Sequence, residues 1–275
     1  MRIELPLTIC LLLASGAASA WGGCEFSAER ALDLDPGSAE RLVLSVGAGE
    51  LEVRGDPAIG QVQLRGRACA SSQELLDQIQ FSGRSVDQRV EAEAQIPTLE
   101  GGWGSNKAYL DVTVVLPARM QVQLRDSSGD LSVRSVAAVK LSDSSGDINV
   151  SDIAGAVEIA DSSGDIEVER VAGDVLVSND SSGDISISEV EGSALVRVDS
   201  SGDIEFDGIR KDAEVDRDSS GSIEFANIGG NARVGSDSSG GIRATRVAGD
   251  FIVAKDGSGE ISHREIGGRV GIPSR

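Results

Sequence analysis

The chain has 275 residues, a formal net charge of −20 and an aromatic content of 3%. A surface this acidic repels nucleic acid and anionic lipid, and no nucleic-acid partner is expected. Acidity also keeps an exported protein soluble, and it leaves cations or basic partners open as ligands.

Residues 1–20 have the layout of a cleavable secretory signal. Arg2 precedes an apolar run, and small residues end at Ala20. The mature chain is therefore predicted to begin near Trp21 and to be periplasmic or extracellular. A lipid anchor is disfavoured, because no cysteine follows the aliphatic and small residues of a lipoprotein signal. No second apolar stretch is long enough to cross a bilayer, so no transmembrane segment is expected.

Removal of the signal leaves two cysteines, Cys24 and Cys69. In an oxidising compartment an isolated pair of this kind is more often a bridge than two free thiols. We therefore expect a disulfide that ties the N-terminal tail, residues 21–41, to the first strands.

Residues 42–125 are predicted to form an irregular β region. The segments 49–53 and 62–64 share the strand and turn pattern of the repeats that follow, which predicts an early coil beginning near Leu42 and then an insertion. Ser71-Ser72-Gln73-Glu74 resembles a capping box and predicts a short helix that covers the N-terminal end of the core. Residues 85–96 and 108–116 are predicted strands.

Residues 126–275 are a regular repeat. D-S-S-G begins at seven positions and a variant, D-G-S-G, at an eighth, with intervals of 17, 18 and then 19 residues; the first residues are Asp126, Asp143, Asp161, Asp180, Asp199, Asp218, Asp237 and Asp256. Numbered from this Asp, positions 6 and 11 are always apolar, and apolar residues alternate with polar ones as in strands. The pattern predicts an all-β fold, a single-stranded parallel β-solenoid with two short strands per coil, for which right-handed crossovers are favoured.

The turn motif has a structural explanation. Asp at the first place of a turn accepts backbone N–H groups, and Gly at the fourth adopts a positive φ. The eight turn glycines are Gly129, Gly146, Gly164, Gly183, Gly202, Gly221, Gly240 and Gly259. Replacement of any of them by a β-branched residue is expected to destabilise its coil.

Positions 8 and 15 exchange volume within a coil. A large residue at one position accompanies a small one at the other, in the pairs Phe206 with Ala213, Phe225 with Ala232, and Phe251 with Ala244. Residues that compensate in this way face each other across a thin core. We expect a filled interior, so that any ligand must bind on the outer faces, the turns or the ends.

The export signal, the strand at residues 110–117 and the S-G-D-[IL]-x-V repeats together resemble a bacterial family. It is the putative-adhesin family of β-strand repeats, domain of unknown function 4097 (DUF4097), and the resemblance covers roughly residues 42–272. The resemblance implies a parallel β-solenoid and carries no catalytic residues. The chain departs from the family pattern at Ser222 and Gly241, which replace the turn Asp.

Calcium is the alternative ligand that the sequence offers. Acidic columns at positions 1 and 5 would form a ladder of carboxylates, comprising Asp126, Asp130, Asp143, Asp147, Asp161, Asp165, Asp180, Asp184, Asp199 and Asp203. The glycine pair of calcium-binding nonapeptide rolls is missing, and the turns already occupy these residues. A calcium-stabilised repeat protein is therefore the second hypothesis, and no other cofactor is predicted.

Enzymatic function is disfavoured. The single histidine, His263, lies in the last coil, where a cap or edge role is favoured over catalysis. Coils of 17–19 residues also leave no loops to build the cleft of a carbohydrate-active β-helix enzyme, which is the third hypothesis. The sequence thus predicts a non-catalytic structural or adhesin-like interaction module of the cell envelope, whose partner is an envelope or surface protein or polymer.

Overall fold

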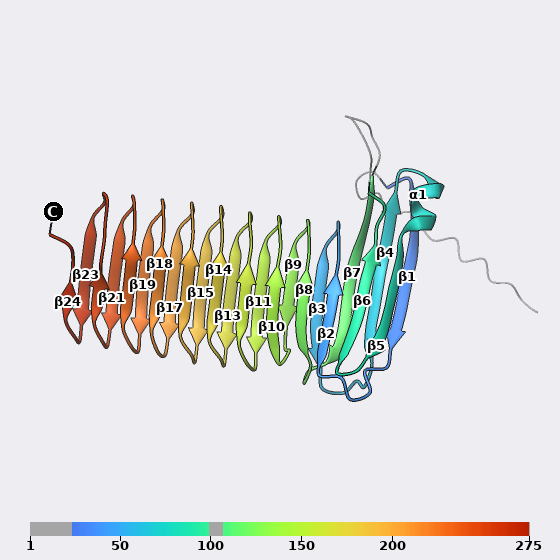
Figure 1. Ribbon diagram of the computed structural model, residues 1–275, viewed down its shortest axis with the longest axis horizontal. Coiled ribbons are helices and arrows are strands. Elements are labelled where there is room, and N and C mark those ends of the chain that lie inside the picture. Colours follow the sequence, from blue (N-terminus) through green and yellow to red (C-terminus); the bar gives the residue numbers. More distant parts are fainter. Residues whose placement is uncertain (1–23, 99–106, 275) are drawn as a thin grey trace, which may run out of the picture.

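The computed structural model describes residues 24–98 and 107–274. They form a rod in which two long sheets face each other, and an antiparallel region closes one end (Figure 1). The predicted signal segment, residues 1–20, lies outside the described residues. Within the described ranges, no helix is both long enough and apolar enough to cross a membrane.

Each sheet has 12 strands. The first runs, in spatial order, β1 (Phe26–Leu34), β4 (Val62–Ala70), β7 (Ala108–Pro117), β3 (Leu51–Asp56), β9 (Leu131–Arg134), β11 (Ile148–Ile153), β13 (Ile166–Val171), β15 (Ile185–Val190), β17 (Ile204–Ile209), β19 (Ile223–Ile228), β21 (Ile242–Val247) and β23 (Ile261–Ile266). The second runs β5 (Gln80–Val86), β6 (Arg89–Gln95), β2 (Arg41–Ser45), β8 (Gln121–Arg125), β10 (Ala138–Ser142), β12 (Val157–Ala160), β14 (Val175–Asn179), β16 (Ala194–Val198), β18 (Ala213–Arg217), β20 (Ala232–Ser236), β22 (Phe251–Val253) and β24 (Val270–Gly271).

The predicted parallel β-solenoid is confirmed. From β8 and β9 onward, each strand pairs in parallel with the equivalent strand of the next coil, as Ile148 with Ile166 and Ile185 with Ile204. Equal repeat positions therefore stack into continuous apolar columns. Phe206 and Phe225 are fully buried, and their rings stack with centroids 5.2 Å apart. The compensating residues thus share one filled core.

A bend at position 10 of each coil was not predicted. Seven non-glycine residues in this column adopt φ between 54° and 58°; they are Ser135, Asp152, Arg170, Glu189, Asn227, Arg246 and Glu265, and Gly208 occupies the remaining coil. The left-handed residue interrupts the alternation of the strand, so that position 11 faces inward as positions 6 and 8 do. The sequence signal was the apolar spacing 6, 8, 11, which breaks the period of two.

The early coil predicted near Leu42 is confirmed, and it consists of β2 and β3. These strands pair in parallel with β8 and β9 on one side and with β6 and β7 on the other. The insertion therefore folds back to build a further coil outside the early one, and spatial order departs from chain order only at this end.

Two details of the N-terminal prediction were wrong. Val62 to Leu64 do not belong to the early coil but to β4, which is antiparallel to both β1 and β7. Residues 85–96 are not one strand, because Asp87, with φ 52°, turns the chain between β5 and β6. A polar turn of two residues inside an alternating pattern is easily taken for strand.

The predicted helix is confirmed as α1 (Gln73–Gln78), with the Ser72 side chain accepting the N–H of Leu75 at 3.2 Å. Strand β1 was not expected from the sequence. Its Arg30 donates to the carbonyl oxygens of Leu76 and Ile79, at 2.8 and 2.6 Å, and so holds the end of the helix against the sheet.

Candidate functional site

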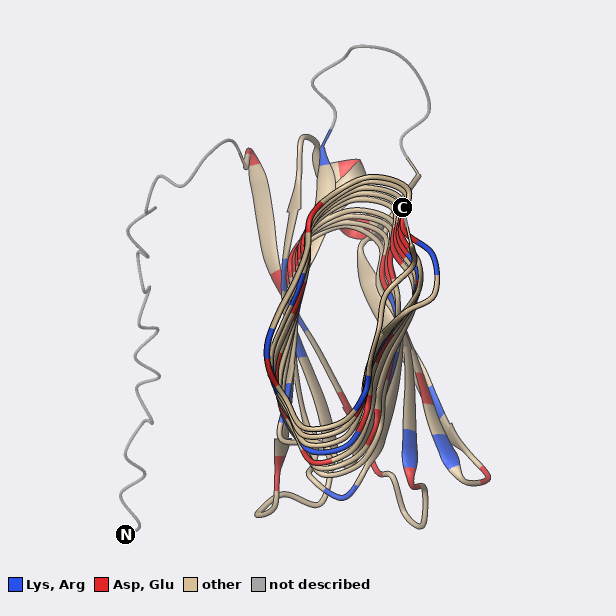
Figure 2. Ribbon diagram, turned by 90° about the vertical axis from the view of Figure 1, so that its left-hand side faces the viewer, with Lys and Arg blue, Asp and Glu red and all other residues tan. Residues whose placement is uncertain are grey.

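The D-S-S-G turns form one edge of the rod, where the chain passes from the second sheet to the first. Viewed along the rod, the coils superpose as a flattened ring, and acidic residues stack in a column at one corner (Figure 2). The first aspartate of every turn and, in five of the turns, a second aspartate at the fifth position contribute to this edge, and the structure gives the two positions different environments.

The first aspartate of each turn points inward. Across the seven D-S-S-G coils, Asp126 to Asp237, these residues are at most 6% exposed, and we call them the inner column. In the inner column from Asp180 onward, Oδ1 accepts serine N–H groups of the same turn, at 2.7 Å from Ser181 for Asp180. The second oxygen, Oδ2, is buried without a hydrogen-bond partner.

The fifth residue of the turn points outward. Oδ1 of Asp165 accepts the backbone N–H of Asp184 in the next coil at 2.9 Å, and Asp184 accepts that of Asp203 at the same distance. This outer ladder comprises Asp130, Asp147, Asp165, Asp184 and Asp203, all exposed, and it ends on the N–H of Ser222. The Asp at the fifth position therefore forms a hydrogen bond between neighbouring coils. The ladder ends at Ser222, where this chain has serine in place of that Asp.

The remaining turn residues also join coils. The hydroxyl of Ser220 donates to the carbonyl oxygen of Ser200 at 3.1 Å, and four other third-place serines do the same. The turn glycines have φ between 114° and 151°. A Cβ at Gly202 would lie 1.8 Å from the carbonyl oxygen of Gly183. Only glycine permits this stacking of backbone on backbone.

The inner column combines burial with like charge. Equivalent residues in neighbouring coils lie about 4.8 Å apart, and two full charges at that distance repel by about 3 kcal/mol at an effective dielectric constant near 20. Burial, which disfavours the charged form, raises the pKa of Asp126 and Asp218 to about 7 and that of Asp143 and Asp180 to about 6. The pKa values of Asp161, Asp199 and Asp237 are raised for the same reason.

The two columns do not converge on a metal site. Among the described residues, no group of three or more His, Cys, Asp or Glu side chains is placed to hold a metal ion. The ten aspartates of the calcium hypothesis divide between the two environments, since Asp126, Asp143, Asp161, Asp180 and Asp199 lie inside while the outer five bind backbone N–H groups. The aspartates of the turns therefore act as hydrogen-bond acceptors within and between coils, and their arrangement does not favour metal coordination.

A surface groove lies where the antiparallel region meets the coils, and the sequence did not predict it. It has a volume of about 770 Å³ and spans β1, β4, β7, β3, β9 and β11. Its lining carries both charges, including Glu29, Arg67, Asp111, Glu52 and Arg134, and Arg134 bonds Glu52 at 2.6 Å. No histidine or cysteine lines it. The arrangement fits a polar ligand with charges of both signs.

His263 lies on β23, the last strand of its sheet, and its side chain is exposed. Its ring is 6.2 Å from that of buried Phe251, so it covers the end of the core. This placement agrees with the edge role expected for it.

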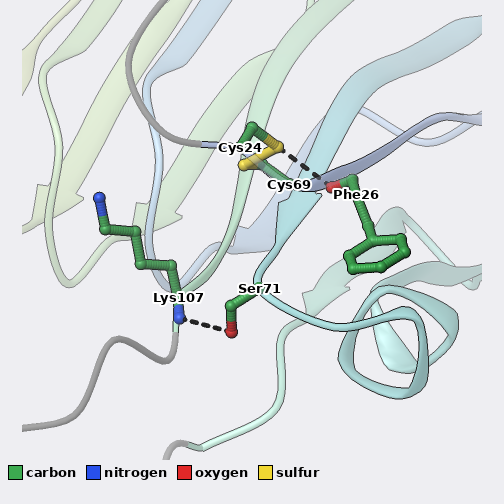
Figure 3. Close-up of a disulfide and its surroundings, with 5 residues drawn as sticks. All are labelled: Cys24, Phe26, Cys69, Ser71 and Lys107. Atoms are coloured by element: carbon green, nitrogen blue, oxygen red, sulfur yellow. Dashed lines mark hydrogen bonds between the residues drawn. A yellow bond between two sulfur atoms is a disulfide. The ribbon is translucent and has the colours of Figure 1, made fainter.

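The disulfide lies at the opposite end of the rod, where β1 and β4 end the first sheet. Figure 3 shows Cys24 and Cys69 together with Phe26, Ser71 and Lys107. Cys24 and Cys69 are joined by an S–S bond of 2.03 Å, which fastens the start of β1 to the end of β4. The Cys24 sulfur is 3.1 Å from the carbonyl oxygen of Phe26, and beside it the N–H of Lys107 donates to Ser71 Oγ at 3.1 Å. These contacts hold the closing end together.

Comparison with known proteins gives a family. The sequence model described as Toastrack DUF4097 matches residues 42–241 and, in a second match, residues 155–265. No curated protein matches the chain significantly.

Solved structures that match the chain come from several bacteria. One, named "putative adhesin", from Bacteroides fragilis NCTC 9343, is 12% identical, with a TM-score of 0.47 over 89% of this chain and 97% of that one. Another, named "putative lipid binding protein", from Parabacteroides distasonis ATCC 8503, is 17% identical, with a TM-score of 0.47 over 86% and 96%. A third, named "putative cell adhesion protein", from Clostridium sporogenes ATCC 15579, is 13% identical, with a TM-score of 0.32 over 89% and 100%.

Proposed function

The chain belongs to the DUF4097 toastrack family, and from that premise we propose that it is a non-catalytic, exported rod that serves as a structural or adhesin-like interaction module of the cell envelope. The observation that carries the proposal is the stack of parallel coils with a filled core. A filled core leaves recognition to the outer surface. The rod therefore acts by presenting side chains on a rigid frame.

The groove at the junction is the surface on which the partner binds. Its side chains stand on strands of both the antiparallel region and the coils, which fixes their spacing. Arg67 lies opposite Glu29 on one neighbouring strand and Asp111 on the other, so positive and negative groups alternate across the groove. We assign as partner an envelope protein or polymer that carries charges of both signs.

A binding measurement with matched variants tests this assignment. The purified chain is titrated against envelope fragments, with Arg67→Glu and Arg134→Glu combined in the groove variant. The control reverses Lys140 and Arg233, which are exposed on the other sheet, and changes the net charge by the same amount. We expect saturable binding that weakens at least tenfold in the groove variant and is unchanged in the control. Equal weakening in both, absence of binding, or turnover of cell-wall or capsular polymers would each overturn the proposal.

Export has its own test. The N-terminal residue of the protein from periplasmic and culture fractions is identified by mass spectrometry, and we expect cleavage just before Trp21. An uncleaved chain that stays in the cytoplasm contradicts the exported location.

A further inference from the structure

The inner column has no counter-charge. Among the described residues, no Lys, Arg or His pairs with Asp126, Asp143, Asp161, Asp180, Asp199, Asp218 or Asp237. The charges that act on these carboxyls are other carboxylates, either column neighbours, as Asp199 and Asp237 are for Asp218, or Asp184 of the outer ladder for Asp199. Full ionisation of the column is therefore opposed by burial and by the neighbouring carboxylates, and only the serine N–H groups of the turns favour the charged form.

The carboxyl oxygens of the column are also incompletely bonded. Oδ2 of Asp180, Asp199, Asp218 and Asp237 is buried and unpartnered, and in Asp126, Asp143 and Asp161 both oxygens lie outside hydrogen-bond geometry. Buried polar atoms in proteins nearly always have a partner. The described residues thus leave at least one buried oxygen of each inner carboxyl without a hydrogen-bond donor.

A proton satisfies both requirements at once. A protonated carboxyl carries no charge, and its O–H can donate to an unpartnered carboxylate oxygen of the neighbouring coil. The register places the carboxyls of the column in succession, because each inner aspartate N–H bonds the residue that precedes the next inner aspartate, as Asp180 N–H does with Val198 O at 2.9 Å. The carboxyls thus follow each other at the strand spacing.

We propose that the inner column is a buried binding site for hydrogen ions, shared between the carboxyls of successive coils, and that acid strengthens the rod instead of unfolding it. The pKa values agree in direction, since those of Asp126 and Asp218 are raised to about 7. A carboxyl with a raised folded-state pKa stabilises the fold below its unfolded-state pKa, and that contribution is lost as the pH rises through the folded-state value. The rod should therefore lose stability between about pH 4 and pH 7.

Two quadruple variants separate the inner column from general acidity. The inner variant combines Asp161→Asn, Asp180→Asn, Asp199→Asn and Asp218→Asn. The outer control combines Asp147→Asn, Asp165→Asn, Asp184→Asn and Asp203→Asn, and thus removes the same number of carboxylates in neighbouring coils. Urea unfolding of the full chain and of both variants is followed from pH 5 to pH 8.

In the wild type, the urea midpoint should rise steadily as the pH falls from 8 to 5. The inner variant should lose most of this rise and have a higher midpoint at pH 8, because the neutral amide still accepts the turn N–H. The outer control should keep the wild-type slope. A midpoint that falls towards pH 5, or equal slopes in both variants, would overturn the proposal.

Two further measurements do not depend on the variants folding. Infrared spectra of the wild type at pH 6 should show a protonated-carboxyl band that disappears on unfolding, and its absence would refute the proposal. The wild-type midpoint at pH 8 is also compared in chelator and in millimolar calcium. We expect no difference, and a rise with calcium would assign the column to metal ions instead of protons.

Discussion

The regular coils and the N-terminal region solve the problem of burial in different ways. In the coils, each position repeats along the rod, and one turn motif supplies the bonds between neighbours through its side chains and glycine. In the N-terminal region, residues distant in sequence are fastened pair by pair, by the disulfide, by Arg30 on the helix end and by antiparallel strands. Stability is thus distributed along the coils and concentrated in a few contacts at the closing end.

The largest effect is expected from the turn glycines that join neighbouring coils. Their role is tested by comparing two glycines of the coils that both have positive φ, Gly202 and Gly208. Gly202→Val should destroy the fold of its coil and its neighbours, because its Cβ would meet the Gly183 carbonyl oxygen at 1.8 Å. Such a clash costs more than the ~4 kcal/mol of an ordinary severe substitution.

The control is Gly208→Asn, in the position 10 column. No atom lies within 3.5 Å of a Cβ there, and Asn227 adopts the same kind of conformation one coil later. We expect the melting temperature of this variant to stay within about 3 °C of wild type, which corresponds to roughly 1 kcal/mol or less. Equal damage from both substitutions would show that the turn glycines have no special role.

Phe225→Ala tests the filled core at the level of one side chain. Phe225 is fully buried and stacks on Phe206, so its removal should cost about 3–5 kcal/mol. Urea unfolding measures the loss. Adding Ala232→Phe, its partner in volume, should recover part of it, and no recovery would contradict the facing arrangement of positions 8 and 15.

Reduction of the disulfide should affect the closing end alone. The Cys24–Cys69 bond spans 45 residues of sequence, and chain entropy gives such a bridge about 4 kcal/mol of stabilisation, with typical values of 2–4. Hydrogen exchange after reduction should accelerate in β1 and β4 and stay unchanged in β15 to β19. Acceleration along the whole rod would show that the two regions unfold as one.

The coils could be predicted from sequence because every position is read eight times. The same apolar position recurs at Ile166, Ile185 and Ile204, which predicts that it is buried in every coil. The nearly constant repeat length then predicts a solenoid of stacked coils. The left-handed residues at position 10 escaped prediction because Asp152, Arg170 and Glu189 share no chemistry. The positive φ at position 10 is indicated only by the spacing of the apolar positions 6, 8 and 11 on either side of it.

The N-terminal region offered no such repetition. Val62 to Leu64 have the same alternation as a coil strand, and only the antiparallel pairing with β1 and β7 distinguishes them. The groove depends on that pairing, so it could not be predicted. The calcium hypothesis placed the aspartates at positions 1 and 5 in one ladder, because a sequence does not tell which side of a tight turn a side chain faces.

Proton release on unfolding tests the central claim about the turn edge most directly. Because the inner carboxyls have raised pKa values, the native chain should hold more protons than the unfolded chain near pH 6. Unfolding the wild type in weakly buffered urea at pH 6 should therefore release protons, measured with a pH electrode or indicator dye, and the inner quadruple Asn variant should release far fewer. Proton uptake by the wild type, or release that is unchanged in the variant, would contradict the account.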